Sequence, residues 1–183
     1  MSTEYISPEY LNLQKELHQN PGYGVASKNY AALIFQSMQR SKTQSLLDYG
    51  AGKGLLYDVL TQMGCTVPYQ GYDPAVERFM KRPDPAEMVV CLDVLEHIEE
   101  DRIDVVIKDI AAHALKEMIL TVATYPAVKT LADGRNAHIL LRDPDWWFAK
   151  IWQHMEILNL RTMRVARPDK KFGHTVLFHC QNW

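Results

Sequence analysis

The stretch Ser45-Leu-Leu-Asp-Tyr-Gly-Ala-Gly-Lys-Gly-Leu-Leu56 decides the fold of this chain. Its apolar start predicts a short buried strand, and the glycines at every second position, Gly50, Gly52 and Gly54, predict a tight turn. An amphipathic helix follows, because apolar residues then recur at helical spacing as far as Met63. The start of such a helix presents unpaired N–H groups and a partial positive charge, which favours an anionic group in front of it.

The spacing of these glycines distinguishes between nucleotide-binding folds. A dinucleotide fingerprint requires G-x-G-x-x-G, but Leu55 stands where the third glycine should be, and the chain has no G-x-x-x-x-G-K-[ST] phosphate loop. The pattern Asp48-x-Gly50-x-Gly52-x-Gly54 instead resembles motif I of the class I S-adenosylmethionine (SAM) dependent methyltransferases. A tight turn with a purely structural role is the alternative interpretation of this motif taken alone.

A second strand is predicted over 65–72, and it ends at Asp73-Pro74, about 20 residues beyond the glycine turn. In doubly wound folds an acidic side chain at this offset binds the ribose, because an aspartate at the carboxyl end of a strand can accept hydrogen bonds from both hydroxyls. A simple Asp-Pro turn is the alternative. Together with the glycines, the sequence favours the assignment of Asp73 to the ribose of a nucleoside cofactor.

A third signature, Leu92-Asp93-Val94-Leu95-Glu96-His97-Ile98, directly follows the strand predicted over 88–92. It resembles the post-strand segment of the small-molecule branch of the family (type 11, UbiE-like), in which D/E-V-L-E-H is common. The resemblance implies SAM as the cofactor and S-adenosylhomocysteine as its product. It also implies a set of cofactor-binding residues, namely Asp48, Gly50, Ala51, Gly52, Asp73, Pro74, Leu92 and Asp93.

The rest of the chain alternates between helical and strand patterns. Helices are predicted over 9–19, 27–39, 75–81, 101–114 and 143–155, and strands over 118–123, 158–165 and 175–180. The predicted fold class is α/β, a Rossmann-like, doubly wound, mostly parallel sheet with a C-terminal antiparallel hairpin. The short segment before residue 88 has no room for the further strand of most family members, so we expect the first edge strand to be missing.

This organisation predicts a single SAM-dependent methyltransferase domain over 1–183. Within it, 1–42 is expected to form an N-terminal helical cap and 43–183 the Rossmann-like core.

A long irregular loop over 124–138 follows a predicted central strand. Loops of this length inside a compact domain are usually functional, and open α/β sheets bind ligands at the carboxyl ends of their strands. His138 is the candidate general base, because an imidazole titrates near neutral pH, and Tyr125 is a candidate for orienting the acceptor. The alternatives are a loop anchor for His138 and packing over the cofactor for Tyr125. The loop also resembles one in a subset of these enzymes associated with surface-sugar and phage gene sets.

Composition and charge limit the class of partner. The chain has 183 residues, enough for one domain, and a net charge of −2, which argues against an extended nucleic-acid footprint. No apolar run approaches the length that spans a membrane. Cys65, Cys91 and Cys180 form no C-x-x-C pair and are interpreted as buried free thiols, which indicates a reducing, cytoplasmic location. We therefore expect a small-molecule acceptor, and the sequence leaves the oligomeric state open.

These signatures predict an enzyme that moves a methyl group from SAM to a small-molecule or sugar acceptor. A non-catalytic SAM-binding module would need the same cofactor residues, and a nicotinamide enzyme is a weaker possibility. Asp93, Glu96, His97 and His138 also resemble the metal site of the small-RNA 3′-terminal 2′-O-methyltransferases, which would make the chain a metal-dependent RNA 2′-O-methyltransferase with Mg²⁺ or Mn²⁺. We prefer an interpretation without a metal, because E-H in this position is common in relatives that bind none.

Overall fold

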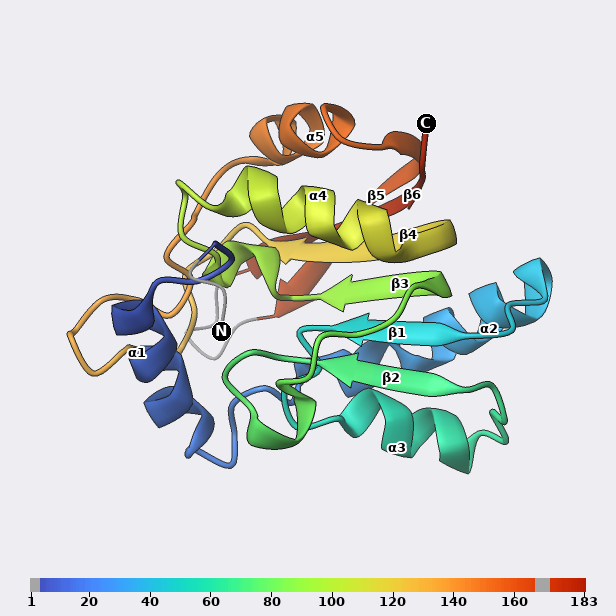
Figure 1. Ribbon diagram of the computed structural model, residues 1–183. Helices are drawn as coiled ribbons and strands as arrows, with labels where there is room; N and C mark the ends of the chain where they lie inside the picture. Colours follow the sequence, from blue (N-terminus) through green and yellow to red (C-terminus); the bar gives the residue numbers. More distant parts are fainter. Residues whose placement is uncertain (1–3, 167–171) are drawn as a thin grey trace.

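A six-stranded sheet runs through the centre of the structure, a computed structural model that describes residues 4–166 and 172–183 (Figure 1). The strand order is β2-β1-β3-β4-β6-β5, in which the first four strands are parallel and β6 is antiparallel to both of its neighbours. The strands are β1 (Leu46–Tyr49), β2 (Tyr69–Tyr72), β3 (Ala86–Leu92), β4 (Ala114–Ala123), β5 (Glu156–Ala166) and β6 (Phe172–Gln181). The α-helices are α1 (Pro8–His18), α2 (Ala31–Ser41), α3 (Leu55–Gln62), α4 (Ile103–His113) and α5 (Pro144–Trp152). The 3₁₀ helices are η1 (Ala26–Tyr30), η2 (Glu77–Phe79) and η3 (Leu95–His97).

Helices cover both faces of the sheet, as expected for a doubly wound fold (Figure 1). α4 and α5 pack on one face, where Trp147 and Phe178 belong to one fully buried cluster. α2 and α3 pack on the other face, where Ile34 and Leu56 are fully buried. Because both of its faces are covered, β3 is a nearly continuous apolar run rather than an alternating one.

The predicted fold class is confirmed. β5 and β6 form the antiparallel hairpin at one end of the sheet, and β2 is the opposite edge, with no strand beyond it in the described part of the chain. The predicted connection between the two hairpin strands falls largely on 167–171, outside the described residues. The division into a cap over 1–42 and a core over 43–183 stays a prediction.

The second strand is shorter than predicted, since it starts at Tyr69 rather than at residue 65. Gly64 turns the chain with a φ of 84°. The residues from there to Pro68 form no strand, because proline lacks the N–H group that would hydrogen-bond to a neighbouring strand. The carbonyl of Pro68 still accepts a hydrogen bond from Leu46 N (2.9 Å), which fixes the register of β2 against β1.

Two predicted helices also differ from the structure. The helix predicted over 75–81 is a single 3₁₀ turn, η2, whose Phe79 carbonyl accepts a hydrogen bond from the Asp73 N–H (2.9 Å). The helix predicted over 27–39 is divided into η1 and α2, and Ser27 is buried within η1 instead of capping a helix. The segment between β2 and β3 holds only the single turn η2, so it has no room for the further edge strand of most family members.

α1 lies beyond the carboxyl ends of the parallel strands (Figure 1). Its start follows from the sequence, because Ser7 caps the helix by accepting a hydrogen bond from Tyr10 N (3.2 Å) and Pro8 occupies the first turn. Ser7 also donates two hydrogen bonds to the Glu99 carboxylate, from its N–H (2.8 Å) and from its hydroxyl (2.6 Å). These bonds hold the first turn of α1 against the loop before α4.

The cysteines are free thiols, of which Cys91 and Cys180 are buried as predicted, whereas Cys65 is only half-buried. Among the helices of the described residues, none has the length and apolar character needed to cross a membrane.

Candidate active site

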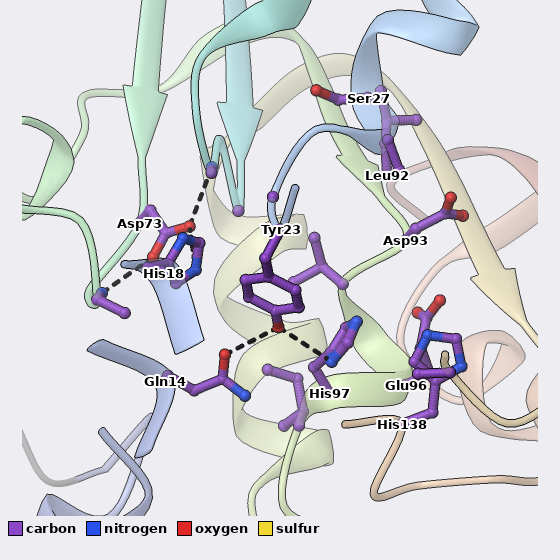
Figure 2. A pocket seen from close by; sticks show the side chains of 18 of the residues that line it. Gln14, His18, Tyr23, Ser27, Asp73, Leu92, Asp93, Glu96, His97 and His138 are labelled. Carbon is purple, nitrogen blue, oxygen red and sulfur yellow. Dashed lines mark hydrogen bonds and ion pairs between the residues drawn. The ribbon is translucent and has the colours of Figure 1, made fainter. Parts of the chain in front are cut away.

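A cavity of about 330 Å³ opens at the carboxyl ends of the parallel strands, between these ends and α1. This volume falls within the range of small-molecule pockets. Its walls come from segments far apart in the sequence: α1 and the turn after it, the glycine turn after β1, the tip of β2, the segment after β3, and the loop after β4 (Figure 2). The position agrees with the rule that open α/β sheets bind ligands outside the carboxyl ends of their strands.

The glycine turn is packed so closely that side chains cannot be added to it. Gly50 has a φ of 86° and Gly52 a φ of 52°, both in the left-handed region that favours glycine. A Cβ on Gly50 would lie 2.3 Å from Val94 Cγ2, and one on Gly52 would lie 2.7 Å from the carbonyl oxygen of Gly24. The glycines are therefore required by the packing of Val94 and Gly24 on the turn, and Gly50 and Gly52 also line the cavity with main-chain atoms alone.

Asp73 is held at the tip of β2 by two backbone groups. Its Oδ2 accepts a hydrogen bond from Gly52 N (3.0 Å) and its Oδ1 accepts one from Ala75 N (2.9 Å). A carboxylate offers about four lone-pair positions, so each oxygen can accept a further hydrogen bond from a ligand. His18 Nε2 lies 3.9 Å from Oδ2, and burial lowers the pKa of His18 although the charge of Asp73 opposes this shift.

Asp93 follows β3 in a strained backbone conformation, with a φ of 54° that aspartate adopts only at a local cost. Its carboxylate accepts hydrogen bonds from the hydroxyl of Tyr30 (2.9 and 3.0 Å) and from Thr121 Oγ1 (2.8 Å). Burial raises the pKa of Asp93, and the two hydroxyl donors oppose the rise. The strained backbone turns the side chain into the wall of the cavity (Figure 2).

Glu96, His97 and His138 converge on the side of the cavity away from Asp73 (Figure 2). One potential ligand atom from each of the three lies within 4.8 Å of the other two. Glu96 is fully buried, and its Oε1 accepts a hydrogen bond from Ala123 N (2.9 Å), while its Oε2 has no partner among the described residues. Asp93, the fourth member of the metal-binding pattern considered from the sequence, is not part of this group.

Backbone carbonyls set the tautomers of the two histidines. His97 Nδ1 lies 2.7 Å from the Ala137 oxygen, and His138 Nδ1 lies 2.6 Å from the Tyr125 oxygen. Since a carbonyl only accepts, we assign the proton to Nδ1 in both rings, and Nε2 is then the basic nitrogen of each neutral imidazole. Two imidazoles and one carboxylate can serve either as proton acceptors or as metal ligands.

Burial dominates the electrostatics of this group. It lowers the pKa of His97 to about 3, with a contribution from the neighbouring His138, so His97 is neutral at physiological pH. It also raises the pKa of Glu96 well above the ordinary value of a carboxyl, and the charge of Asp93 adds to this rise. The group therefore carries less negative charge than its composition implies.

One asparagine shapes the loop that carries His138. Asn136 Oδ1 accepts hydrogen bonds from Ala127 N (2.9 Å) and His138 N (3.0 Å), and its Nδ2 donates to the Ala127 oxygen (2.9 Å). The ring of Tyr125 packs so closely against β6 that a Cβ on Gly173 would lie 2.2 Å from it. The loop thus holds both candidate catalytic side chains at the cavity wall.

The structure brings most of the predicted site residues into the wall of this one cavity: Gly50, Gly52, Asp73, Pro74, Leu92, Asp93, Tyr125 and His138. It does not bring Asp48 and Ala51 there. Asp48 is buried on the α3 side of the sheet, where it accepts a hydrogen bond from the Tyr69 hydroxyl (2.8 Å), and Ala51 is buried under the turn.

The sequence predicts an N-terminal helical cap over 1–42, but it does not show which side chains of this segment enter the site. The hydroxyl of Tyr23 donates to Gln14 Oε1 (2.9 Å) and lies 3.3 Å from His97 Nδ1, so the segment touches the histidine group directly (Figure 2). The ring of Tyr23 also makes edge-to-face contacts with His18 and His97. The Asn20-Pro-Gly turn predicts a bend before Tyr23, but no local pattern shows where the bend leads.

Comparisons with known proteins agree with this geometry. A family model described as a methyltransferase domain matches residues 17–176 of the chain. The search of curated protein sequences finds no match.

Several solved structures share the fold. The magnesium protoporphyrin IX methyltransferase of Synechocystis PCC 6803, crystallised with S-adenosylhomocysteine, has a TM-score of 0.59 and 16% identity over 87% of this chain and 84% of its own. The N-methyltransferase NodS of Bradyrhizobium japonicum, also crystallised with S-adenosylhomocysteine, has a TM-score of 0.60 and 12% identity over 94% and 97%. A Nostoc punctiforme protein described as an O-methyltransferase has a TM-score of 0.56 and 13% identity, and this chain covers 61% of its length. At these identities the likeness is one of fold.

Proposed function

The chain belongs to the methyltransferase domain family, and from this premise we propose that it transfers a methyl group from SAM to a small-molecule or sugar acceptor and releases S-adenosylhomocysteine. Within the family we assign it to the small-molecule branch, on the strength of the segment from Leu92 to Ile98. The fold neighbours that were crystallised with SAM or S-adenosylhomocysteine support the choice of cofactor.

The residues of the cavity fit this cofactor. Gly50 and Gly52 line the cavity with main-chain atoms alone, so the methionyl part can lie against the backbone of the turn. Asp73 is oriented by two backbone N–H groups and keeps capacity to accept the ribose hydroxyls. The carboxylates of Asp73 and Asp93 both line the cavity, so they complement a cationic sulfonium.

Methyl transfer from SAM requires few catalytic side chains from the protein. When bound, SAM supplies an electrophilic methyl group on a sulfonium that is displaced in line, so the protein mainly aligns the reactants and excludes water. His138 Nε2 accepts the proton of the acceptor nucleophile, because its Nδ1 is committed to the Tyr125 carbonyl. Tyr125 orients the acceptor from the same loop.

One observation carries the proposal: the glycine turn, Asp73, Asp93 and His138 come from four distant segments and line a single cavity. The direct test is to incubate the protein with SAM and a panel of small nucleophiles and sugars and to measure S-adenosylhomocysteine release. We expect release with at least one acceptor, and slower release from Asp73→Ala when SAM is kept below the Kd of that variant. Tight SAM binding without release would favour a non-catalytic SAM-binding module, and binding of NAD instead of SAM would contradict the proposal.

A metal-dependent methyltransferase is a second candidate, supported by the proximity of Glu96, His97 and His138. The unpartnered Glu96 Oε2 and the two backbone-anchored imidazoles form a mixed oxygen and nitrogen donor set that suits Mn²⁺, Fe²⁺ or Zn²⁺. The net charge of −2 does not favour an RNA acceptor, whose phosphates would need compensating cations.

Elemental analysis and turnover in a chelator decide between the two candidates. A bound metal at one equivalent, lost in Glu96→Gln together with activity, would establish the second. Full activity in the chelator, with no metal in the purified protein, would remove it and leave His138 as the proton acceptor.

A further inference from the structure

Lys129 is the one lysine or arginine among the described residues that line the cavity. It belongs to the loop after β4 that also carries His138, and it is half-buried. The carboxyl groups of the wall belong to Asp73, Asp93 and Glu96, which come from other elements. The described wall therefore holds a single side chain with a permanent positive charge.

A short hairpin fixes the main chain of Lys129 beside His138. The Lys129 carbonyl accepts a hydrogen bond from Ala137 N (3.0 Å), and the next residue, Thr130, forms an antiparallel bridge with Asn136. Ala137 directly precedes His138, so the lysine and the proposed proton acceptor start from neighbouring positions of one hairpin. Because both side chains also line the cavity, one acceptor can contact both.

The amine of Lys129 reaches the turn that follows α1. A Cβ added to Gly22 would lie 4.0 Å from Lys129 Nζ, and Gly22 itself lines the cavity. The next residue, Tyr23, has its hydroxyl 3.3 Å from His97 Nδ1. The amine therefore lies at the cavity wall where the loop after β4 meets the N-terminal segment.

This amine has no counter-charge in the protein. Within residues 4–166 and 172–183, no carboxylate oxygen lies within 4.0 Å of Lys129 Nζ, and the amine donates no hydrogen bond. The acids of the wall are bonded elsewhere: Asp73 accepts two main-chain N–H groups, Glu96 accepts one, and Asp93 accepts two hydroxyl groups. The ammonium thus keeps its donors for a ligand, and an anionic oxygen group is its strongest partner.

Building on the proposed function, we propose that Lys129 binds an anionic group of the methyl acceptor, a carboxylate or a phosphate, while His138 Nε2 takes the proton of the acceptor nucleophile. The acceptor is then an organic acid or a phosphorylated sugar. The carboxylate of the cofactor is the other anionic group that could reach the cavity. We assign the lysine to the acceptor because its main chain is paired beside His138, whereas the amino-acid part of the cofactor is placed along the glycine turn.

The first test measures binding by calorimetry on the full chain saturated with S-adenosylhomocysteine. Two matched pairs serve as probes: 4-methylphenol with 4-hydroxyphenylacetate, and glucose with glucose 6-phosphate. At least one anionic probe should bind about tenfold or more tightly than its neutral partner, and Lys129→Met should weaken that probe by about 10- to 150-fold, the range for a hydrogen bond to a charged group. Lys129→Arg keeps the charge and should retain the preference for the anionic probe.

The matched control for this test is Lys108→Met. It removes an exposed lysine of α4 that lies outside the cavity wall, so every probe should bind it as it binds the wild type. Anionic probes that bind the wild type no better than their neutral partners would overturn the proposal. An anionic preference that persists in Lys129→Met would overturn it as well.

The second test separates the acceptor from the cofactor. Lys129→Met should bind S-adenosylhomocysteine and 5′-methylthioadenosine, which lacks the amino acid, within about threefold of wild type. A loss above about tenfold for S-adenosylhomocysteine alone would place the amine on the cofactor carboxylate and overturn the proposal. Each of these results leaves the proposed function standing if S-adenosylhomocysteine binds the wild type. Failure of the wild type to bind S-adenosylhomocysteine would instead contradict the proposed function itself.

Discussion

The main-chain nitrogen of Gly52 donates a buried hydrogen bond to Asp73 Oδ2 over 3.0 Å, and this bond joins the glycine turn after β1 to the tip of β2. Two sequence features that are separate along the chain therefore form one rigid unit in the fold. Beside this bond, Gly50 N and Ala51 N both donate to the Tyr72 carbonyl (2.7 and 3.0 Å). The unit fixes the carboxylate before any ligand arrives, which lowers the cost of ordering it on binding.

Removal of the Asp73 carboxylate should weaken the binding of S-adenosylhomocysteine. We expect Asp73→Ala to cost about 1.5–3 kcal/mol, the range for hydrogen bonds to a charged group. Calorimetry measures the change, and Asp84→Ala is the matched control, because Asp84 is exposed and lies outside the cavity wall. An affinity of Asp73→Ala within twofold of wild type would contradict the ribose assignment.

Substitution of the glycine turn should cost stability through a steric clash. Gly50→Ala combines an unfavourable φ of 86° with a Cβ 2.3 Å from Val94 Cγ2, and we expect a loss of about 3 kcal/mol or more in the free energy of unfolding. Gly64→Ala has a similar φ of 84° but no atom within 4 Å of its Cβ, so only the backbone penalty of about 1 kcal/mol applies. Urea unfolding compares the two variants, and equal losses would show that the close packing of the turn is unimportant.

His138→Ala should lower turnover far more than it lowers cofactor affinity. A general base contributes about 10²- to 10⁴-fold to the rate, whereas its removal leaves the glycine turn and Asp73 intact. We therefore expect kcat to fall by at least about a hundredfold while the Kd for S-adenosylhomocysteine stays within about threefold. His174→Ala, an exposed histidine on β6, serves as the control. A parallel fall of both quantities, or of neither, would argue against the role of His138.

The stability of the protein should depend on the ionisation of Asp48. Burial raises the pKa of Asp48 to about 7; the hydrogen bond from Tyr69 opposes the rise and the charge of Asp73 adds to it. Between the ordinary carboxyl value near 4 and pH 7, the folded protein then keeps a proton that the unfolded chain has released. The free energy of unfolding must therefore fall as the pH rises through this window.

Comparison with Asp48→Asn isolates the contribution of the Asp48 carboxyl to the pH dependence of stability. From pH 5 to pH 7.5 the wild type should lose about 2 to 3 kcal/mol more stability than Asp48→Asn, which cannot ionise. Asp58→Asn removes an exposed carboxyl from α3 and should follow the wild type. Parallel pH profiles for wild type and Asp48→Asn would show that Asp48 is ionised in the folded protein at pH 5.

The sequence predicts the fold well because its strongest signals are local. The glycine turn, the apolar run of β3 and the cap at Ser7 each follow from short stretches of chain. The prediction is less accurate where a local signal is ambiguous, as at Thr66 and Val67, whose β-branched side chains suggest a strand that Gly64 and Pro68 prevent. The six-strand order itself depends on how the elements pack together.

The site is predictable only in part, for a related reason. Asp73, Asp93 and His138 are found because each follows a predicted strand, and such positions gather at one edge of a parallel sheet. Tyr23 is not found, since its contact with His97 joins residues 74 positions apart through tertiary packing alone. Asp48 was predicted in the site but lies outside it. Side chains alternate along a strand, so Asp48 points away from the cavity that its neighbour Tyr49 lines.

A crystal structure of the protein with S-adenosylhomocysteine bound tests the central claim most directly. We expect the ribose hydroxyls within hydrogen-bond distance of the Asp73 carboxylate and the amino-acid part against the backbone of Gly50 and Gly52. Nucleoside density elsewhere on the molecule, or a ribose that makes no contact with Asp73, would contradict the account.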